Sequence, residues 1–169
     1  KKALLKQNRE LDEQAVQCFK NIMSYMGDRK SSKPQLAHAK KLLTNLMGSA
    51  GSLRDEAYMQ LCKQTTQNPR VVSTIKGWEL MLFCIATFPP SKHLKAFLME
   101  YIKKAIKDNA QEKITALAEM CLKQLPKIVL MGQRRQVPAK LEMECLIDMK
   151  PVPIRVLCCN GSFKTFMVD

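Results

Sequence analysis

Residues 78–88, with the sequence WELMLFCIATF, are apolar on more than one side of a helix. A helix with one apolar stripe lies at a protein surface, whereas a helix that is apolar on several sides is surrounded by other elements. We therefore expect a helix over about 71–87 to occupy the middle of a helical bundle. Pro89 and Pro90 end this helix abruptly, because proline cannot continue the backbone hydrogen-bond pattern.

Three amphipathic helices are predicted before this central helix, because apolar residues recur there at intervals of three and four. They cover about 11–26, 36–47 and 53–65. Ser52 and Asp55 resemble a capping box, in which two side chains bind the free amides of a helix start. The third helix is therefore predicted to begin near residue 53.

Three further helices are predicted after the central one. Ser91 can cap the first of them, which buries an apolar side made of Leu94, Phe97, Leu98, Tyr101, Ile102 and Ala105. The next helix covers 111–131, and Pro126 should kink or split it. Pro138 is placed at the first turn of a short helix that ends near Met149. The predicted fold is all-α: a compact bundle of six to eight helices.

The pattern changes at Pro151, where apolar residues begin to alternate with other residues as in a strand. Asn160-Gly161 is a strong signal for a two-residue hairpin turn between two such strands. A lone hairpin is marginal in water, so this short C-terminal β-hairpin indicates the first two strands of a truncated β-containing domain. Because the first residue is not Met, we expect the chain to be a piece of a longer protein.

The composition favours a packed soluble domain with acidic partners. The chain has 169 residues, of which 46% are hydrophobic and 25% charged, and its formal net charge is +13. Its longest mainly apolar stretch is about half the roughly 20 residues that a bilayer-spanning helix needs. A positive field of this kind attracts acidic protein tails, anionic lipid or nucleic acid, and solubility alone is the alternative explanation.

The sequence offers no arrangement of residues that could catalyse a reaction. The seven cysteines are an odd number without a CxxC pair, which is typical of core residues in a reducing compartment. His38 and His93 lack partners at zinc-finger spacing and lack a nucleophile in a recognisable motif. No glycine-rich phosphate loop is present. We therefore expect no catalytic, cofactor-binding or metal-ligating residues, and a cytosolic binding module.

Basic residues are concentrated along one predicted helix. Lys92, Lys95, Lys103 and Lys107 recur near helical spacing, with Lys104 beside them. Such a row is either a solvated face or a docking surface. Nucleic acid is disfavoured as the partner, because aromatic residues make up only 6% of the chain and fall mostly on buried faces.

Four sequence blocks together resemble the myosin tail homology four domain. They are 25–28, 53–69, 77–80 and 88–91, with the sequences YMGD, LRDEAYMQLCKQTTQNP, GWEL and FPPS. The resemblance covers roughly 1–150. Residues 151–169 are similar to the opening hairpin of a FERM domain, and the two domains follow each other in this order in the tails of unconventional myosins.

The resemblance implies a non-catalytic module that binds cargo and microtubules, together with the adjoining FERM domain, in an unconventional myosin tail. The protein would be cytoplasmic and cytoskeleton-associated, and would reach actin only through a parent motor domain. The hypothetical contacts with acidic tubulin tails are Lys92, Lys95, Lys103, Lys104 and Lys107, with Arg134 and Arg135 as a second patch. A membrane-associated adaptor that uses the basic face on anionic lipid or acidic partners is the alternative.

The resemblance also suggests structural rather than binding roles for several residues of the blocks. Arg54, Asp55 and Glu56 lie at a helix start, and buried salt bridges are the expected reason for their presence. Gly77 and Trp78 are likewise expected to serve the packing of the bundle.

Overall fold

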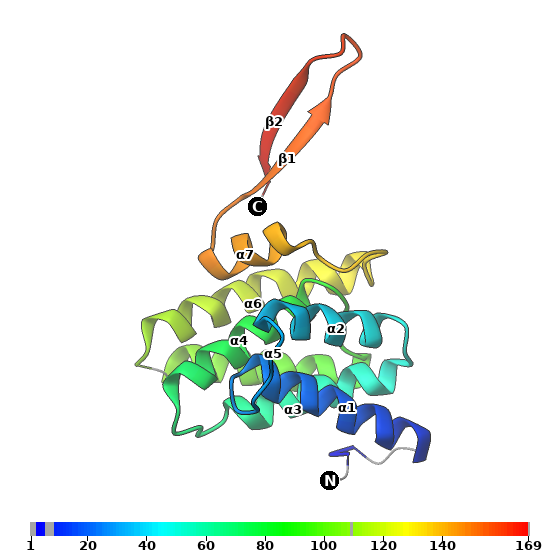
Figure 1. Ribbon diagram of the computed structural model, residues 1–169. Coiled ribbons are helices and arrows are strands. Elements are labelled where there is room, and N and C mark those ends of the chain that lie inside the picture. The colour runs from blue at the N-terminus through cyan, green and yellow to red at the C-terminus, as the bar shows by residue number, and fades with distance from the viewer. Residues whose placement is uncertain (1–2, 6–8, 109, 169) are drawn as a thin grey trace. The chain divides into compact units, whose positions relative to one another are not determined.

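The computed structural model describes residues 3–5, 9–108 and 110–168, and these residues form helices followed by one β-hairpin (Figure 1). The helices are α1 (Arg9–Tyr25), α2 (Gln35–Met47), α3 (Gly51–Thr65), α4 (Val71–Ile85), α5 (Lys92–Asp108), α6 (Glu112–Met131) and α7 (Lys140–Asp148). The strands are β1 (Val152–Leu157) and β2 (Phe163–Val168). The chain forms two compact units, 1–137 and 138–169. The predicted helical bundle with a C-terminal hairpin is confirmed.

Helix α4 is the centre of the first unit, as its apolar sequence predicts. It packs against α1, α2, α3 and α6, while α5 packs chiefly against α6. Every side chain from Leu80 to Ile85 is fully buried. Edge-to-face ring pairs add specific geometry to this core, with Tyr25 on Phe83 and Tyr58 on Phe88 at centroid distances of 6.0 and 5.8 Å.

The start of α3 differs from the predicted capping box. The helix begins at Gly51 after the N-cap Ala50, so Ser52 lies inside its first turn. The Asp55 carboxylate instead accepts a hydrogen bond of 2.9 Å from the amide of Ser91. The Ser91 hydroxyl in turn accepts one from the amide of Leu94, which confirms Ser91 as a cap of α5. Asp55 therefore holds the start of a distant helix rather than of its own.

The two prolines near α6 and α7 differ in part from their predicted roles. Helix α6 is not split at Pro126, which lies on its exposed side, while Cys121, Leu125 and Ile128 are buried. Pro138 does not occupy the first turn of the following helix. It precedes the N-cap Ala139, where its fixed backbone angle directs the chain into α7.

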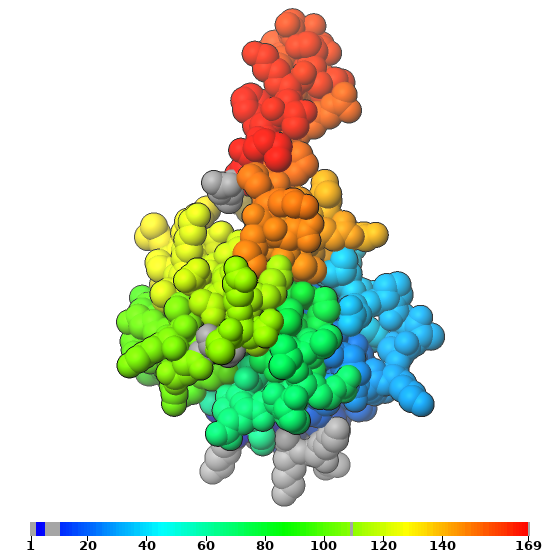
Figure 2. Space-filling view, turned by 90° about the vertical axis from the view of Figure 1, so that its left-hand side faces the viewer, coloured from blue at the N-terminus to red at the C-terminus, as the bar shows by residue number. Residues whose placement is uncertain are grey.

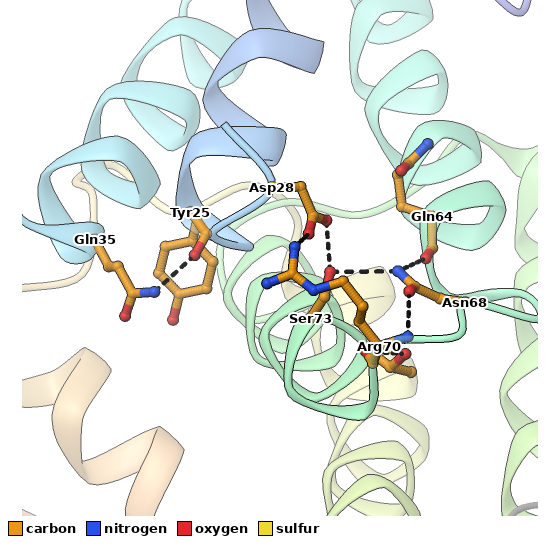
Figure 3. A network of polar contacts seen from close by, with 8 residues as sticks. Tyr25, Asp28, Gln35, Gln64, Asn68, Arg70 and Ser73 are labelled. Atoms are coloured by element: carbon orange, nitrogen blue, oxygen red, sulfur yellow. Dashed lines mark hydrogen bonds and ion pairs between the residues drawn. The ribbon is translucent and has the colours of Figure 1, made fainter. Parts of the chain in front are cut away.

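A polar network ties the loop after α1 to the start of α4 (Figure 3). The Asp28 carboxylate accepts hydrogen bonds from Arg70 Nη1 at 2.7 Å and from Ser73 Oγ at 2.5 Å. Asn68 completes the connection by donating to the carbonyl of Gln64 at 3.0 Å and to Ser73 Oγ at 3.3 Å. The sequence blocks YMGD and QNP thus meet in space, and they fix the loops that orient α4.

The expected buried salt bridges at the start of α3 are absent among the residues that the structure describes. Arg54 donates hydrogen bonds to the Gln133 side chain and to the Ser49 carbonyl. Glu56, fully buried, accepts hydrogen bonds from the backbone amides of Leu4 and Leu5 and from Gln60. Both side chains therefore bind neutral groups, of neighbouring segments and of Gln60 within α3, instead of pairing with each other.

Gly77 and Trp78 serve the packing of α4, as expected. A Cβ atom at Gly77 would collide with the γ-methyl of Thr65 and lie 3.2 Å from the terminal methyl of Met26. The small residue therefore allows α3 and α4 to approach closely. Trp78, only 1% exposed, lies beside it in the same helix.

The hairpin of the second unit is antiparallel, with Val152 opposite Val168 and Leu157 opposite Phe163. Its turn is longer than the predicted two residues. The Cys158 amide donates to the Ser162 carbonyl, and the Gly161 amide donates to the Cys158 carbonyl. Gly161 has a φ of +78°, a conformation that glycine adopts without strain. The turn therefore has three residues, with Gly161 as the bulge residue.

Candidate docking surface on α5

The lysines of α5 are not all on one face. Lys92 and Lys103 are separated by about three turns of helix, and Lys107 follows Lys103 by one turn, so these three exposed side chains share one side. Lys104 is exposed next to them. Lys95 is half-buried and lies about 60° around the helix from Lys92, in the direction away from Lys104, so the five lysines span about half of the helix circumference.

The C-terminal end of α5 carries more lysines than acids, with Lys103, Lys104 and Lys107 against Glu100 and Asp108. Lys103 pairs with Glu100 at 2.8 Å, but both side chains are exposed, so the pair contributes little to stability. Lys104 and Lys107 have no ion-pair partner among the described residues. These three lysines form a compact positive patch, which we call the α5 patch.

Arg134 and Arg135 lie at the other end of α5. The Arg134 amide donates a hydrogen bond of 2.9 Å to the carbonyl of Thr87, which shortly precedes the first residue of α5. The Arg135 side chain is exposed and that of Arg134 is half-buried. Lys103 is about 16 Å along the helix from Lys92, so the arginine pair and the α5 patch are separate sites.

A groove runs beside the α5 patch. Its volume is about 680 Å³, and its lining comes from α3, α4, α5 and the segment after α3: Thr65, Thr66, Gln67, Trp78, Phe97, Glu100, Tyr101, Lys104, Ala105 and Asp108. Figure 2 shows the end of the bundle where the C-terminal part of α5 and the start of α6 (yellow-green) lie near the segment after α3 (blue-green). Lys104 belongs to both the groove and the α5 patch.

Three aromatic rings form a stack in this groove. Tyr101 lies almost parallel to Trp78 on one side and to Phe97 on the other, with centroid distances of 5.8 and 6.4 Å. Trp78 is buried, whereas Phe97 is 48% exposed. The prediction that Phe97 points into the core was therefore wrong: the ring ends the stack at the surface.

The Tyr101 hydroxyl holds the stack in place. It shares a hydrogen bond of 2.7 Å with the Thr65 hydroxyl and donates to the Cys62 carbonyl at 3.1 Å. Burial raises the pKa of this hydroxyl, and its hydrogen bonds with Thr65 and Thr66 lower the pKa by less. The phenol therefore stays neutral at physiological pH. No sequence pattern predicts the groove, because its residues come from several helices.

A third basic cluster surrounds His38 at the start of α2. Arg29, Lys33 and Lys41 act electrostatically on this buried imidazole. Its Nε2 atom lies 2.7 Å from the hydroxyl of Ser31. The sequence analysis missed this cluster, because the basic residues are divided between a loop and a helix and become neighbours only when the loop folds back.

The His38 environment predicts a pH dependence of stability. Burial, and then the nearby cations, lower the pKa of His38 below its usual value of about 6.5. The unfolded chain therefore binds more protons as the pH falls through about 6.5, and the free energy of unfolding decreases in that direction. Above this range the effect is absent. Urea unfolding at about pH 7.5 and about pH 5.5 should show a smaller pH difference for H38Q than for the natural chain. Equal differences would contradict the prediction.

The buried cysteines of the described residues have raised pKa values, and these residues hold no cluster of metal-ligating side chains. All seven cysteines are free thiols. Burial raises the pKa of Cys18 and of Cys62 to about 12, so neither is a nucleophile at neutral pH. Within 3–5, 9–108 and 110–168, no three metal-ligating side chains converge on one point. In the same part of the chain, no helix is long and apolar enough to span a membrane.

Comparison with known proteins gives a consistent family. Residues 39–145 match the model of the MyTH4 domain. The chain is 32% identical to the myosin-I heavy chain of Dictyostelium discoideum over 92% of its own length and 7% of that protein. It is 33% identical to the kinesin-like protein KIN-14E of Arabidopsis thaliana over 99% of its length and 14% of that protein.

Solved structures agree with the sequence relatives. The MyTH4-FERM MF1 domain of Dictyostelium discoideum myosin VII superimposes with a TM-score of 0.88 at 32% identity, covering 100% of this chain and 35% of that one. The C-terminal MyTH4-FERM domain of human myosin 7b, solved in complex with the harmonin-a PDZ3 domain, gives a TM-score of 0.81 at 27% identity, covering 95% and 33%.

Proposed function

The chain belongs to the MyTH4 domain family, and from this we propose that it is a non-catalytic docking module that binds acidic protein segments through the α5 patch. The family is found in the tails of myosins and kinesin-like motors, in tails that combine MyTH4 with FERM. The chain spans 7% and 14% of the first two curated relatives. Any motor activity, and any contact with actin, would belong to other parts of a parent protein.

Microtubules are the proposed filament partner, through the acidic tails of tubulin. The observation that carries this proposal is the exposed α5 patch, in which Lys104 and Lys107 lack ion pairs among the described residues. Kinesin-like relatives, which share the domain at about one-third identity, add support. Lys92 on the same side of α5 extends the patch, and Arg134 with Arg135 forms a second basic site.

Cargo or adaptor proteins are proposed to bind together with an adjoining FERM domain, in the cytoplasm and near the cytoskeleton. The human myosin 7b relative was solved with a PDZ domain bound to its MyTH4-FERM unit. The alternative, an adaptor that places its basic face on anionic lipid, uses the same lysines. A binding experiment must therefore present both a filament and a membrane.

Charge reversal of the α5 patch tests the proposal. Replacing Lys103, Lys104 and Lys107 with Glu should weaken co-sedimentation with microtubules by at least about tenfold at low salt, because each glutamate repels the acidic tails that each lysine attracts. The difference should shrink as salt rises, since exposed charges are screened beyond about 10 Å at 0.1 M ionic strength.

The matched control reverses Lys20, Lys123 and Lys127, three exposed lysines outside the α5 patch, with the same change in net charge. Lys123 and Lys127 have the same spacing as Lys103 and Lys107. Equal losses in both variants would show that only net charge matters and would contradict a specific surface. Pelleting with anionic vesicles but not with microtubules would favour the membrane alternative.

A further inference from the structure

An aromatic stack ends in the groove beside the α5 patch, and its last ring is open to solvent. Trp78 and Tyr101 are fixed in the bundle, and Phe97 presents about half of its surface to solvent next to them. A single exposed ring is common on soluble proteins, but Phe97 is stacked on Tyr101 and lines a groove, so its free face continues an existing ring stack. The position of Phe97 at the end of a stack leaves room for one further flat apolar side chain within about 680 Å³.

The backbone beside the groove is also unusual. Gln67 has a φ of +49°, a left-handed conformation that is uncommon outside glycine, asparagine and aspartate. Such positions concentrate at binding sites, where the surrounding structure maintains the strain. The Gln67 side chain is exposed and makes no hydrogen bond to the described residues. Its amide group is therefore available to the backbone of a bound peptide.

The charge around the groove selects the kind of peptide. The charged side chains that line the groove are Glu100, Lys104 and Asp108, and Glu100 forms an exposed ion pair with Lys103 of the α5 patch. With Lys107 on the same helix, the unpaired lysines outnumber the remaining acid, Asp108. A segment with carboxylates around an apolar anchor therefore complements this region in both charge and shape.

We propose that this groove takes one aromatic side chain of an acidic partner segment, whose flanking carboxylates contact the α5 patch. The inference deepens the proposed docking function and rests on it. The lysines alone would attract any acidic chain, whereas the ring stack discriminates between acidic chains that carry an aromatic residue and those that do not.

The natural chain contains a reporter of this event. Trp78 is its single tryptophan and lines the groove, so its fluorescence reports binding there. The probes are two synthetic Glu-rich peptides that differ only in a central residue, Phe or Ala. We expect the Phe peptide to change the Trp78 emission. It should also bind about tenfold more tightly than the Ala peptide, because burying one aromatic ring against others adds about that much affinity.

The variant F97A should remove this preference. Phe97 is half exposed, so its truncation leaves the core intact, and circular dichroism checks that the fold is retained. The matched control is L130A, which truncates an apolar side chain that is 88% exposed and lies outside the groove. L130A should keep the full preference for the Phe peptide.

The outcomes separate this inference from the proposed function. Equal affinity of the natural chain for both peptides, or an undiminished preference in F97A, would overturn the groove as an aromatic site. If the lysine charge reversal still abolished microtubule binding, the proposed function would stand without the groove. A preference that depends on Phe97 and on Lys104, tested with K104E, supports the inference.

Discussion

Replacing Glu56 with Ala is expected to lower the free energy of unfolding by about 3–5 kcal/mol, which is a large part of the stability of a domain of this size. Glu56 is fully buried, and its two oxygens accept hydrogen bonds from the amides of Leu4 and Leu5 at 2.8 and 2.7 Å and from Gln60 at 2.7 Å. The buried Gln60 amide that loses its acceptor costs about 1–3 kcal/mol, and the part-buried amides of Leu4 and Leu5 and the cavity left by the side chain add the rest. The carboxylate thus attaches the segment before α1 to the middle of α3.

The substitution E56Q separates hydrogen bonding from shape. Glutamine fills the same space and keeps one acceptor, but its NH₂ group would face a backbone N–H. We expect about half of the loss seen in E56A. The control is E100A, which removes an exposed glutamate and should change stability by no more than about 0.5 kcal/mol. Urea unfolding followed by circular dichroism measures all three, and a loss below about 1 kcal/mol in E56A would contradict this role.

The core of the bundle could be predicted from the sequence because its signals are local. The apolar sides of α4 determine its central position, and Pro89-Pro90 together with Gly132 mark helix ends through backbone restrictions that act within a few residues. Ser91 is also recognisable as a cap from local sequence, because it binds the amide of Leu94 only three residues later. The hairpin follows from alternation around Asn160-Gly161, and only the length of its turn was wrong.

The remaining features depend on contacts between residues distant in sequence. Phe97 fits the apolar stripe of α5 by spacing alone, yet its ring is 48% exposed and lies in a groove that several helices line. Asp55 fits a capping box, but the amide of Ser91, 36 residues away, offers it a better partner. Along α5, periodicity places the lysines around the helix but not relative to Arg134, whose position is set by a hydrogen bond to the end of α4.

Removing the Glu79 carboxylate should be as damaging as removing that of Glu56, for a different reason. Glu79 is 2% exposed and accepts hydrogen bonds from Tyr25 Oη at 2.7 Å and from Lys76 Nζ at 2.8 Å. Burial raises the pKa of Tyr25, and the adjacent carboxylate raises it further, so the phenol remains a donor. E79A leaves this hydroxyl unpaired and Lys76 without its counter-ion, at a cost of about 3–5 kcal/mol.

A combined variant tests the origin of the stability loss in E79A. The loss comes either from the partners that are left without a hydrogen bond or ion pair, or from the removal of the carboxylate itself. Buried charges that are removed together with their partners and replaced by apolar side chains of similar size often leave stability unchanged or higher. The variant that combines Y25F, K76M and E79L should therefore be more stable than E79A alone by at least about 2 kcal/mol in urea unfolding. Additive losses from the three substitutions would mean instead that the three side chains act independently, because coupled neighbours depart from additivity by about 0.5–3 kcal/mol.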